Sequence, residues 1–268
     1  RLVAVKVFTL DLTPEQSVRL ADELGQLVDA AMPMRHVAAP ISSGVIDTVA
    51  YLAEAYVSGE SLDAALRQYG PAPAPDAARL VSHVADALEA AARAGVFHGS
   101  LHPRDILVTP GETHLTGLGV AQAIEKQGVR PPVRRPYAAP ERESGEAWGS
   151  PADVFALAAI AHEVLTGKRA LPGTEEPFPG LEALKGFDTT LLRDALDAAM
   201  DVDPARRPSA SEFAAASAAS AGAAGGETPA AGAKSKRRAA RARAVPKLPG
   251  LEDPLSVPAA GVVPDAQH

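Results

Sequence analysis

The 268-residue sequence contains no cysteine, and only 4% of its residues are aromatic. The absence of cysteine excludes disulfides, zinc–thiolate sites and thiol nucleophiles, and it fits a reducing compartment, so we expect a cytoplasmic location. No apolar run reaches the length of about 18 to 20 residues that crosses a bilayer, and the first residues do not resemble a signal peptide. Because the sequence starts at Arg1 and runs directly into a strand-like segment, we expect further residues to precede it, and a membrane tether elsewhere in a full-length protein stays open.

Charge divides the chain into two parts. The whole sequence is 46% hydrophobic with a formal net charge of −7, whereas residues 218–268 carry seven basic and four acidic residues in a background of Ala, Gly and Pro. Such a segment has too few large apolar side chains to offset the entropy of ordering. We therefore predict a folded part over residues 1–217 and a disordered basic tail over 218–268, whose cations are available to anionic surfaces.

Local patterns in the folded part predict strands first and helices afterwards. Thr13, Pro14 and Gln16 form an N-cap, a first-turn proline and a capping-box partner, which predicts a helix to about Met32. The apolar spacing predicts further elements, namely a strand at 2–8, a hairpin and extended segment at 41–57, short strands near 106–108 and 114–116, and helices at 63–69, 76–94, 153–166, 190–200 and 209–216.

Six short motifs occur in an order that is similar to one family. They are Val3-Ala4-Val5-Lys6, His98 to Val108, Thr116-Gly117-Leu118-Gly119, Pro136 to Glu141, Asp153 to Leu157 and Asp203 to Pro208. Together they resemble the protein kinases, in their bacterial serine/threonine form. The resemblance implies an α+β, bilobal fold, with a partial β-rich small lobe over residues 1–57 and a mainly helical large lobe over 58–217. It also implies that the glycine-rich loop over the nucleotide lies before Arg1.

The sequence departs from the kinase pattern at the residues that carry the chemistry. Ser100 stands where the family has its catalytic aspartate, and a serine hydroxyl is not basic near neutral pH. His102 replaces the lysine of the same loop, and Gly117 replaces the principal metal ligand. Asp105 replaces the asparagine that binds the second metal ion, and it still offers oxygen to magnesium. Losing several electrostatic elements together predicts the loss of most catalysis.

The segment before Tyr137 departs from the family as well. No serine or threonine lies between Gly119 and Tyr137, so phosphorylation there cannot activate the domain. Arg134 and Arg135 stand near the expected peptide-docking groove, either as a solvated basic loop or as a docking surface for an acidic or phosphorylated partner.

The residues with architectural roles in the family are retained. The resemblance implies a buried ion pair between Glu141 and Arg207, hydrogen bonds from the catalytic-loop backbone to Asp153, and support of that loop by His98. Losing one member of such a pair leaves a costly unpaired charge. A metal site at His98 and His102 is not expected, because they lie in a loop without further ligands.

Nucleotide binding rests on Lys6, which the resemblance places at the ATP phosphates. Ala4 is expected to line the adenine pocket, and Ala55 to Val57 to form the hinge that hydrogen-bonds the purine. Glu23 is our predicted helix partner of Lys6, with a register uncertain by one turn. Glu54, at the position of the usual apolar or hydroxyl gatekeeper, is expected to reach Lys6 and crowd the pocket.

These observations favour a pseudokinase that works as a regulatory or scaffolding module for a protein partner, itself a signalling protein or kinase. ATP is the expected ligand, bound without magnesium. The alternative is a weakly active serine/threonine kinase that uses Asp105 to hold magnesium. A third reading is a nucleic-acid or membrane tether through the basic tail, but no aromatic residues alternate with its cations, and no specific nucleic acid is expected.

Overall fold

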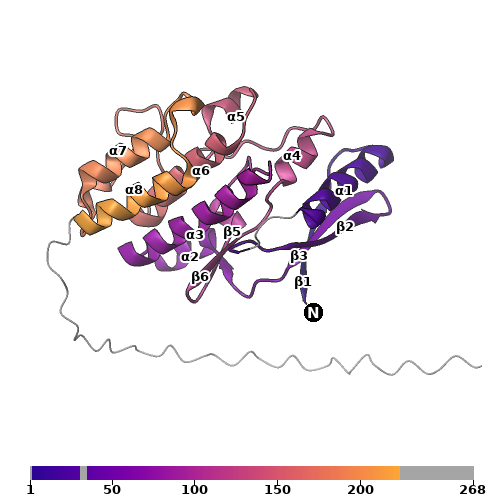
Figure 1. The fold of residues 1–268 in the computed structure, drawn as a ribbon, viewed down its shortest axis with the longest axis horizontal. Helices are drawn as coiled ribbons and strands as arrows, with labels where there is room; N and C mark the ends of the chain where they lie inside the picture. Colours follow the sequence, from indigo (N-terminus) through magenta and orange to yellow (C-terminus); the bar gives the residue numbers. More distant parts are fainter. Residues whose placement is uncertain (1, 31–34, 224–268) are drawn as a thin grey trace, which may run out of the picture. The chain divides into compact units, whose positions relative to one another are not determined.

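A computed structural model describes residues 2–30 and 35–223 of the chain (Figure 1). The helices and strands described below lie within one compact unit. Residues 224–268 of the predicted disordered tail, and Met32 as the predicted end of the first helix, fall outside the described residues.

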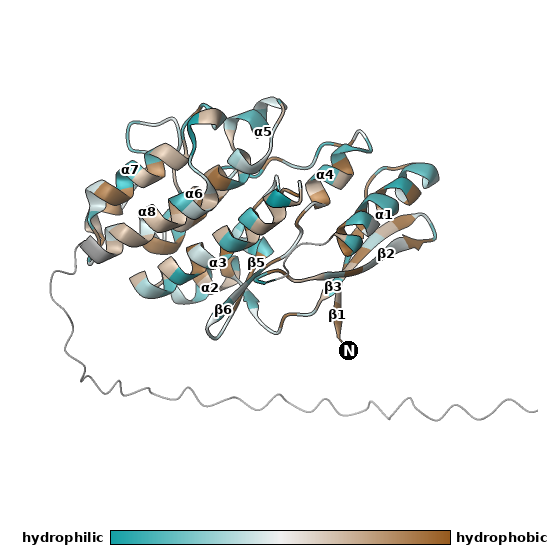
Figure 2. Ribbon diagram, in the orientation of Figure 1, coloured by the Kyte–Doolittle hydropathy of each residue, from teal (hydrophilic) through white to brown (hydrophobic). Residues whose placement is uncertain are grey.

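The small lobe is an antiparallel sheet with one helix packed on it. Strands β1 (Val3–Phe8), β2 (Pro40–Ile46) and β3 (Val49–Ala55) lie in the order β1-β3-β2. Helix α1 (Pro14–Asp29) begins with the predicted capping box. Its leucines at 20, 24 and 27 are buried in the core. Figure 2 shows hydrophilic residues beside hydrophobic ones along α1, the pattern of a helix covered on one side.

A second sheet and two helices begin the large lobe. Strands β4 (Glu60–Ser61), β5 (Ile106–Thr109) and β6 (Glu112–Leu115) pair in sequence order. Helix α2 (Leu62–Tyr69) follows β4 directly, and α3 (Ala74–Arg93) buries an apolar stripe in the common core. The loop between α3 and β5 leads into this sheet and contains residues 98–105 of the motif His98 to Val108.

Helix α6 (Ser150–Thr166) lies in the middle of the large lobe and is buried on nearly every side, as the sequence predicts. Helices α7 (Thr189–Ala199) and α8 (Ala210–Ala223) pack on α6, while α4 (Val120–Glu125) packs on α1, and α5 (Pro140–Ser144) precedes α6 in the chain. Helix α8 continues past residue 217, where composition placed the end of the folded part. Ser217 and Ser220 are buried, because small side chains let α8 pack closely on its neighbours.

The connection from α1 to β2 is fastened to the large lobe. Val37 forms a parallel bridge with Leu115, and the backbone groups of His36 and Ala38 hydrogen-bond to the backbone of Leu115. The ring of His36 stacks on His83 of α3 with centroids 3.9 Å apart. These contacts fix the small sheet over the loop that follows α3, and so define the cleft between them.

Candidate functional site in the cleft

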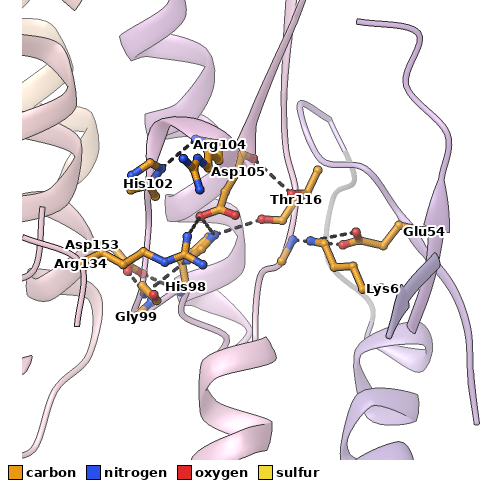
Figure 3. A network of polar contacts seen from close by, with 12 residues as sticks. Lys6, Glu54, His98, Gly99, His102, Arg104, Asp105, Thr116, Arg134 and Asp153 are labelled. Atoms are coloured by element: carbon orange, nitrogen blue, oxygen red, sulfur yellow. Dashed lines mark hydrogen bonds and ion pairs between the residues drawn. The ribbon is translucent and has the colours of Figure 1, made fainter. Parts of the chain in front are cut away.

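The small-lobe side of the cleft is formed by an ion pair between two strands. Lys6 on β1 and Glu54 on β3 lie on one face of the sheet, because Lys6 is opposite Leu52 and Glu54 is opposite Ala4. The Nζ atom of Lys6 lies 3.0 Å from Oε2 of Glu54. The Glu54 side chain is 4% exposed and that of Lys6 33%, so the carboxylate is buried while the ammonium still reaches solvent. Glu54 is therefore the partner of Lys6 (Figure 3).

Glu54 also joins the two lobes. Its Oε1 atom accepts a hydrogen bond from the backbone N–H of Gly117 at 3.0 Å. Gly117 has a left-handed backbone with φ of 81°, a conformation that costs any residue with a side chain. A Cβ atom built there would lie 3.1 Å from Nζ of Lys6. Gly117, at the position that the resemblance assigns to the main metal ligand, thus contributes only a backbone N–H group. That group donates its hydrogen bond to Glu54.

The large-lobe side of the cleft contains a second ion pair. Nη1 of Arg134 lies 3.2 Å from Oδ2 of Asp105, and Nε2 of His98 lies 3.9 Å from the same oxygen. The backbone carbonyl of Asp105 accepts the N–H of Thr116, which holds the loop against the strand that leads to Gly117. Figure 3 shows Arg134 and His98 converging on Asp105. The carboxylate that the alternative of a weakly active kinase would use for magnesium is therefore paired with an arginine of the chain itself.

The catalytic-loop residues form a fixed but chemically altered loop. The imidazole of His98 contacts the carbonyl of Thr116 through Nε2 and the N–H of Ser100 through Nδ1. Burial, and next the charge of Arg134, lower the pKa of His102. A neutral His102 cannot supply the positive charge that the family's lysine supplies, and Ser100 cannot act as the base.

These groups surround a cavity of about 320 Å³. Its polar lining comes from Lys6, His98, Ser100, Asp105, Gly117 and Arg134, and its apolar lining includes Phe8, Val120 and Ile124. The volume is at the lower end of the range of small-molecule sites, about 300 to 1,000 Å³. Two cationic side chains, those of Lys6 and Arg134, therefore line the same cavity.

The residues expected at the adenine lie apart from this cavity. Ala4, Ala55 and Val57 are not among its lining residues. The backbone N–H of Ala55 donates to the carbonyl of Ala39, and the carbonyl of Val57 accepts the N–H of Gly59. The cavity thus includes the lysine expected at the phosphates and none of these residues expected at the adenine.

The predicted pairing of Glu23 with Lys6 is wrong. Glu23 forms an ion pair with Lys126, directly after α4. Nearby, Gln16 and Arg19 of α1 hydrogen-bond to Gln127. The reason is that α4 packs along α1 and offers Glu23 a cation outside the cleft, while Glu54 already neutralises Lys6.

Sequence reasoning missed a cluster beside the catalytic loop. Trp148 packs against Gly99, where a Cβ atom would lie only 2.2 Å from the indole ring. The guanidinium of Arg142 lies 4.1 Å from the Trp148 ring centroid, donates to the carbonyl of Gly99 and pairs with Glu125. The signals in the sequence were the glycine directly after His98 and the single tryptophan of the chain.

The architectural contacts hold the large lobe together. Arg207 binds Glu141 through two hydrogen bonds of 2.6 and 2.9 Å, and both side chains are buried. Asp153 accepts the backbone N–H groups of His98 and Gly99 at 2.8 and 2.7 Å. Burial raises the pKa of Asp153. The contacts of Asp153 position the catalytic loop on α6, and the Glu141 pair holds Arg207 against α5.

The described residues do not fit the magnesium ions that protein kinases use. No group of three His, Asp or Glu residues that could hold a metal ion occurs in residues 2–30 and 35–223. The cleft has the carboxylates of Asp105 and Glu54, which Arg134 and Lys6 already bind. Gly117 has no side chain to offer. Residues of the chain alone therefore provide too few free oxygen donors for a magnesium ion, which prefers carboxylates together with phosphates.

Within the same described ranges, no helix is long and apolar enough to cross a membrane.

Comparison with known proteins gives one family. The family model described as "Protein kinase domain" matches residues 1–217. The serine/threonine-protein kinase PknH of Mycobacterium tuberculosis is 31% identical over 171 residues, which cover 62% of this chain and 27% of PknH. PknD of the same species is 32% identical over 177 residues, covering 62% of this chain and 26% of PknD. PknE of Mycobacterium bovis is 29% identical over 180 residues, covering 65% and 32%.

The chain thus spans about a quarter to a third of the length of these relatives. Its elements, an antiparallel sheet with one helix followed by a mainly helical lobe, agree with the α+β fold of that family. The chain belongs to the protein kinase family, with bacterial serine/threonine kinases among its relatives.

Proposed function

We propose that this domain is a pseudokinase, which keeps the kinase fold and acts by binding a protein partner and a nucleotide. The observation that carries the proposal is that each carboxylate of the cleft is neutralised by a cation of the chain. Glu54 binds Lys6 and the N–H of Gly117, and Asp105 binds Arg134. In an active kinase, acidic side chains at the cleft hold magnesium against the phosphates.

The altered loop supports the loss of phosphotransfer. Kinase catalysis consists of positioning and of electrostatic stabilisation of charge on the transferred phosphoryl group. Ser100 offers no base, His102 offers no charge near pH 7, and Gly117 offers no metal ligand. Restoring one of them leaves the other two absent, so a single reversion is not expected to recover the reaction.

The cavity supports retained binding of an anionic ligand. Lys6 and Arg134 both line it, and the exposed part of Lys6 faces a space large enough for phosphate groups. ATP is the proposed nucleotide, bound through these cations and not through magnesium. The proposed partner is a signalling protein or another kinase, which a kinase-like domain without phosphotransfer would position or regulate.

A phosphotransfer assay tests the central point. The full chain is incubated with ATP labelled at the γ-phosphate, with magnesium or manganese, beside an active bacterial serine/threonine kinase. We expect no more label on the chain or on an added protein substrate than the Asp105→Ala variant gives, because alanine offers no oxygen to a metal ion. Incorporation by the wild type that Asp105→Ala abolishes would replace the proposal with the weakly active kinase, in which Asp105 holds the metal ion.

A further inference from the structure

Arg134 occupies an unusual place in the cleft. It lies before Pro136 in the segment that leads to α5, and its backbone carbonyl accepts the N–H groups of Tyr137 and Ala138 at 3.0 and 3.1 Å. These bonds form a turn that fixes the direction of its side chain. The guanidinium then reaches Asp105 on the loop after α3 and lines the same cavity as Lys6.

The neighbouring arginine has a different orientation. Arg135 makes a bidentate pair with Glu143 of α5, at 2.8 and 2.6 Å, on the surface of the large lobe. It does not line the cavity of Lys6 and Asp105. Two adjacent arginines with the same charge therefore have separate roles, one toward the cleft and one toward the surface.

Most N–H groups of the Arg134 guanidinium make no hydrogen bond with the described residues. Among the described residues its one hydrogen-bond acceptor is Oδ2 of Asp105, which uses Nη1. An arginine side chain carries five N–H donors in a planar fork that suits phosphate oxygens. The side chain is 40% exposed, so an entering anion can reach the remaining donors while the pair with Asp105 stays in place.

We infer that Arg134 is the phosphate ligand of this site and takes the place of the magnesium ion. This inference rests on the proposed nucleotide binding. In it, Arg134 and Lys6 together bind the phosphates of a nucleotide without a metal ion. Arg134 neutralises Asp105, which would otherwise repel the phosphates, and it adds charge-assisted hydrogen bonds to them. The same pair keeps Asp105 from binding a metal ion, so the arginine and magnesium exclude each other.

This exclusion predicts a reversal of metal dependence. In the wild type, ATP with chelator should bind at least as tightly as ATP with magnesium. In Arg134→Gln, the phosphates lose their second cation and Asp105 becomes free. Magnesium is commonly held by one or two carboxylates together with substrate phosphates, so the variant should acquire binding that magnesium strengthens. A purely structural role of Arg134 would not produce this change.

The experiment is a calorimetric titration of the full chain with ATP, once with magnesium and once with chelator. Arg134→Gln should weaken binding in chelator by about tenfold to a hundredfold, as expected for loss of a charged hydrogen bond. Addition of magnesium should recover part of that loss. Arg134→Lys, which keeps the charge, should bind in chelator more tightly than Arg134→Gln. Arg135→Gln, which removes the same charge at the surface pair, should bind as the wild type does.

Melting curves without ligand establish that each variant is folded. If Arg134→Gln binds ATP with the affinity of the wild type, and magnesium leaves both unchanged, the role of Arg134 is overturned while nucleotide binding stands. If Arg135→Gln weakens binding as much as Arg134→Gln, the effect is one of general charge and the inference is likewise overturned. If the wild type binds no ATP under either condition, both the inference and the proposed nucleotide binding fail.

Discussion

Glu141 and Arg207 form an ion pair inside the large lobe, and Lys6 and Glu54 form one at the cleft. Both pairs join segments far apart in sequence, and both contain a buried carboxylate. They differ in origin. The first pair uses the residues that the kinase resemblance assigns to it, whereas the second uses a carboxylate where the family has an apolar or hydroxyl residue. The ion pair that holds the large lobe together thus follows the family pattern, whereas the ion pair at the cleft departs from it.

The residues that stabilise the fold of this domain are therefore different from the charged residues that line its cleft. Glu141, Arg207 and Asp153 hold the loops on α5 and α6 without touching the cavity of Lys6. Substitutions in the cleft therefore leave the large-lobe contacts intact. In the proposed function, the ion pairs of the cleft determine which ligand enters, and we expect them to have less effect on whether the chain folds.

The largest expected effect comes from breaking the large-lobe pair. Glu141→Gln leaves the buried guanidinium of Arg207 without a charged partner, which should lower the free energy of unfolding by about 3 to 5 kcal/mol. Urea unfolding followed by circular dichroism measures the change. Glu143→Gln is the matched control, since Glu143 lies in the same helix and pairs with Arg135 at the surface. It should cost about 1 kcal/mol or less. Equal costs for the two variants would contradict the difference drawn between fold contacts and surface pairs.

The second prediction concerns the loss of stability at low pH, to which a histidine of the large-lobe core and one of the catalytic loop contribute separately. Burial lowers the pKa of His162 in α6 from its ordinary value of 6.5, and burial is also the main reason that the pKa of His102 is lowered. The unfolded chain then takes up protons more readily than the folded one. The contribution of these two histidines to stability is therefore fully present above pH 6.5 and is lost as the pH falls below it, by at most about 1.4 kcal/mol per pH unit for one proton.

Unfolding in urea at several pH values between 7.5 and 5 measures this slope. His162→Leu removes the titrating group from the core and should flatten the slope. His102→Asn should remove a separate part of the slope, because His102 lies in the catalytic loop and not in α6. A wild type that gains stability as the pH falls from 7.5 to 5 would show that these histidines do not control the acid response.

Much of the fold could be predicted from local sequence patterns. Thr13, Pro14 and Gln16 predicted the start of α1 because a capping box needs only neighbouring residues. The apolar composition of 153–166 predicted a helix buried on all sides, as α6 is. Helix α8 was predicted too short, since alanine and serine look alike in a buried helix and in a solvated tail.

The cleft was harder to predict because its contacts are set by the register of distant segments. Lys6 was predicted from its motif, and Glu54 was expected to reach it, but Glu23 was chosen as its main partner. Nothing in the spacing of α1 indicates that Lys126 lies beside Glu23. Arg134 and Asp105 are also 29 residues apart in the sequence. The sequence alone does not show which acidic residue an arginine in a proline-rich loop will bind.

The smallest expected effect distinguishes the two glutamates that were candidates for Lys6. Glu54→Gln keeps an oxygen that accepts the N–H of Gly117, and it removes the negative charge that competes with phosphate for Lys6. Binding of ATP in chelator should therefore become tighter by roughly threefold to tenfold, a change of at most about 1.4 kcal/mol. Calorimetric titration of the full chain measures it.

Glu23→Gln makes the same chemical change on α1 and serves as the control. Because Glu23 binds Lys126 outside the cavity, the affinity for ATP should stay at the wild-type value. A variant of Glu23 that alters ATP binding as strongly as Glu54→Gln would mean that α1 moves to Lys6 when nucleotide enters. The cleft would then use the helix partner common to the family, and its rewiring would be confined to the state without ligand. Equal affinity of Glu23→Gln and wild type, with a tighter Glu54→Gln, instead makes Glu54 the residue that controls access to Lys6.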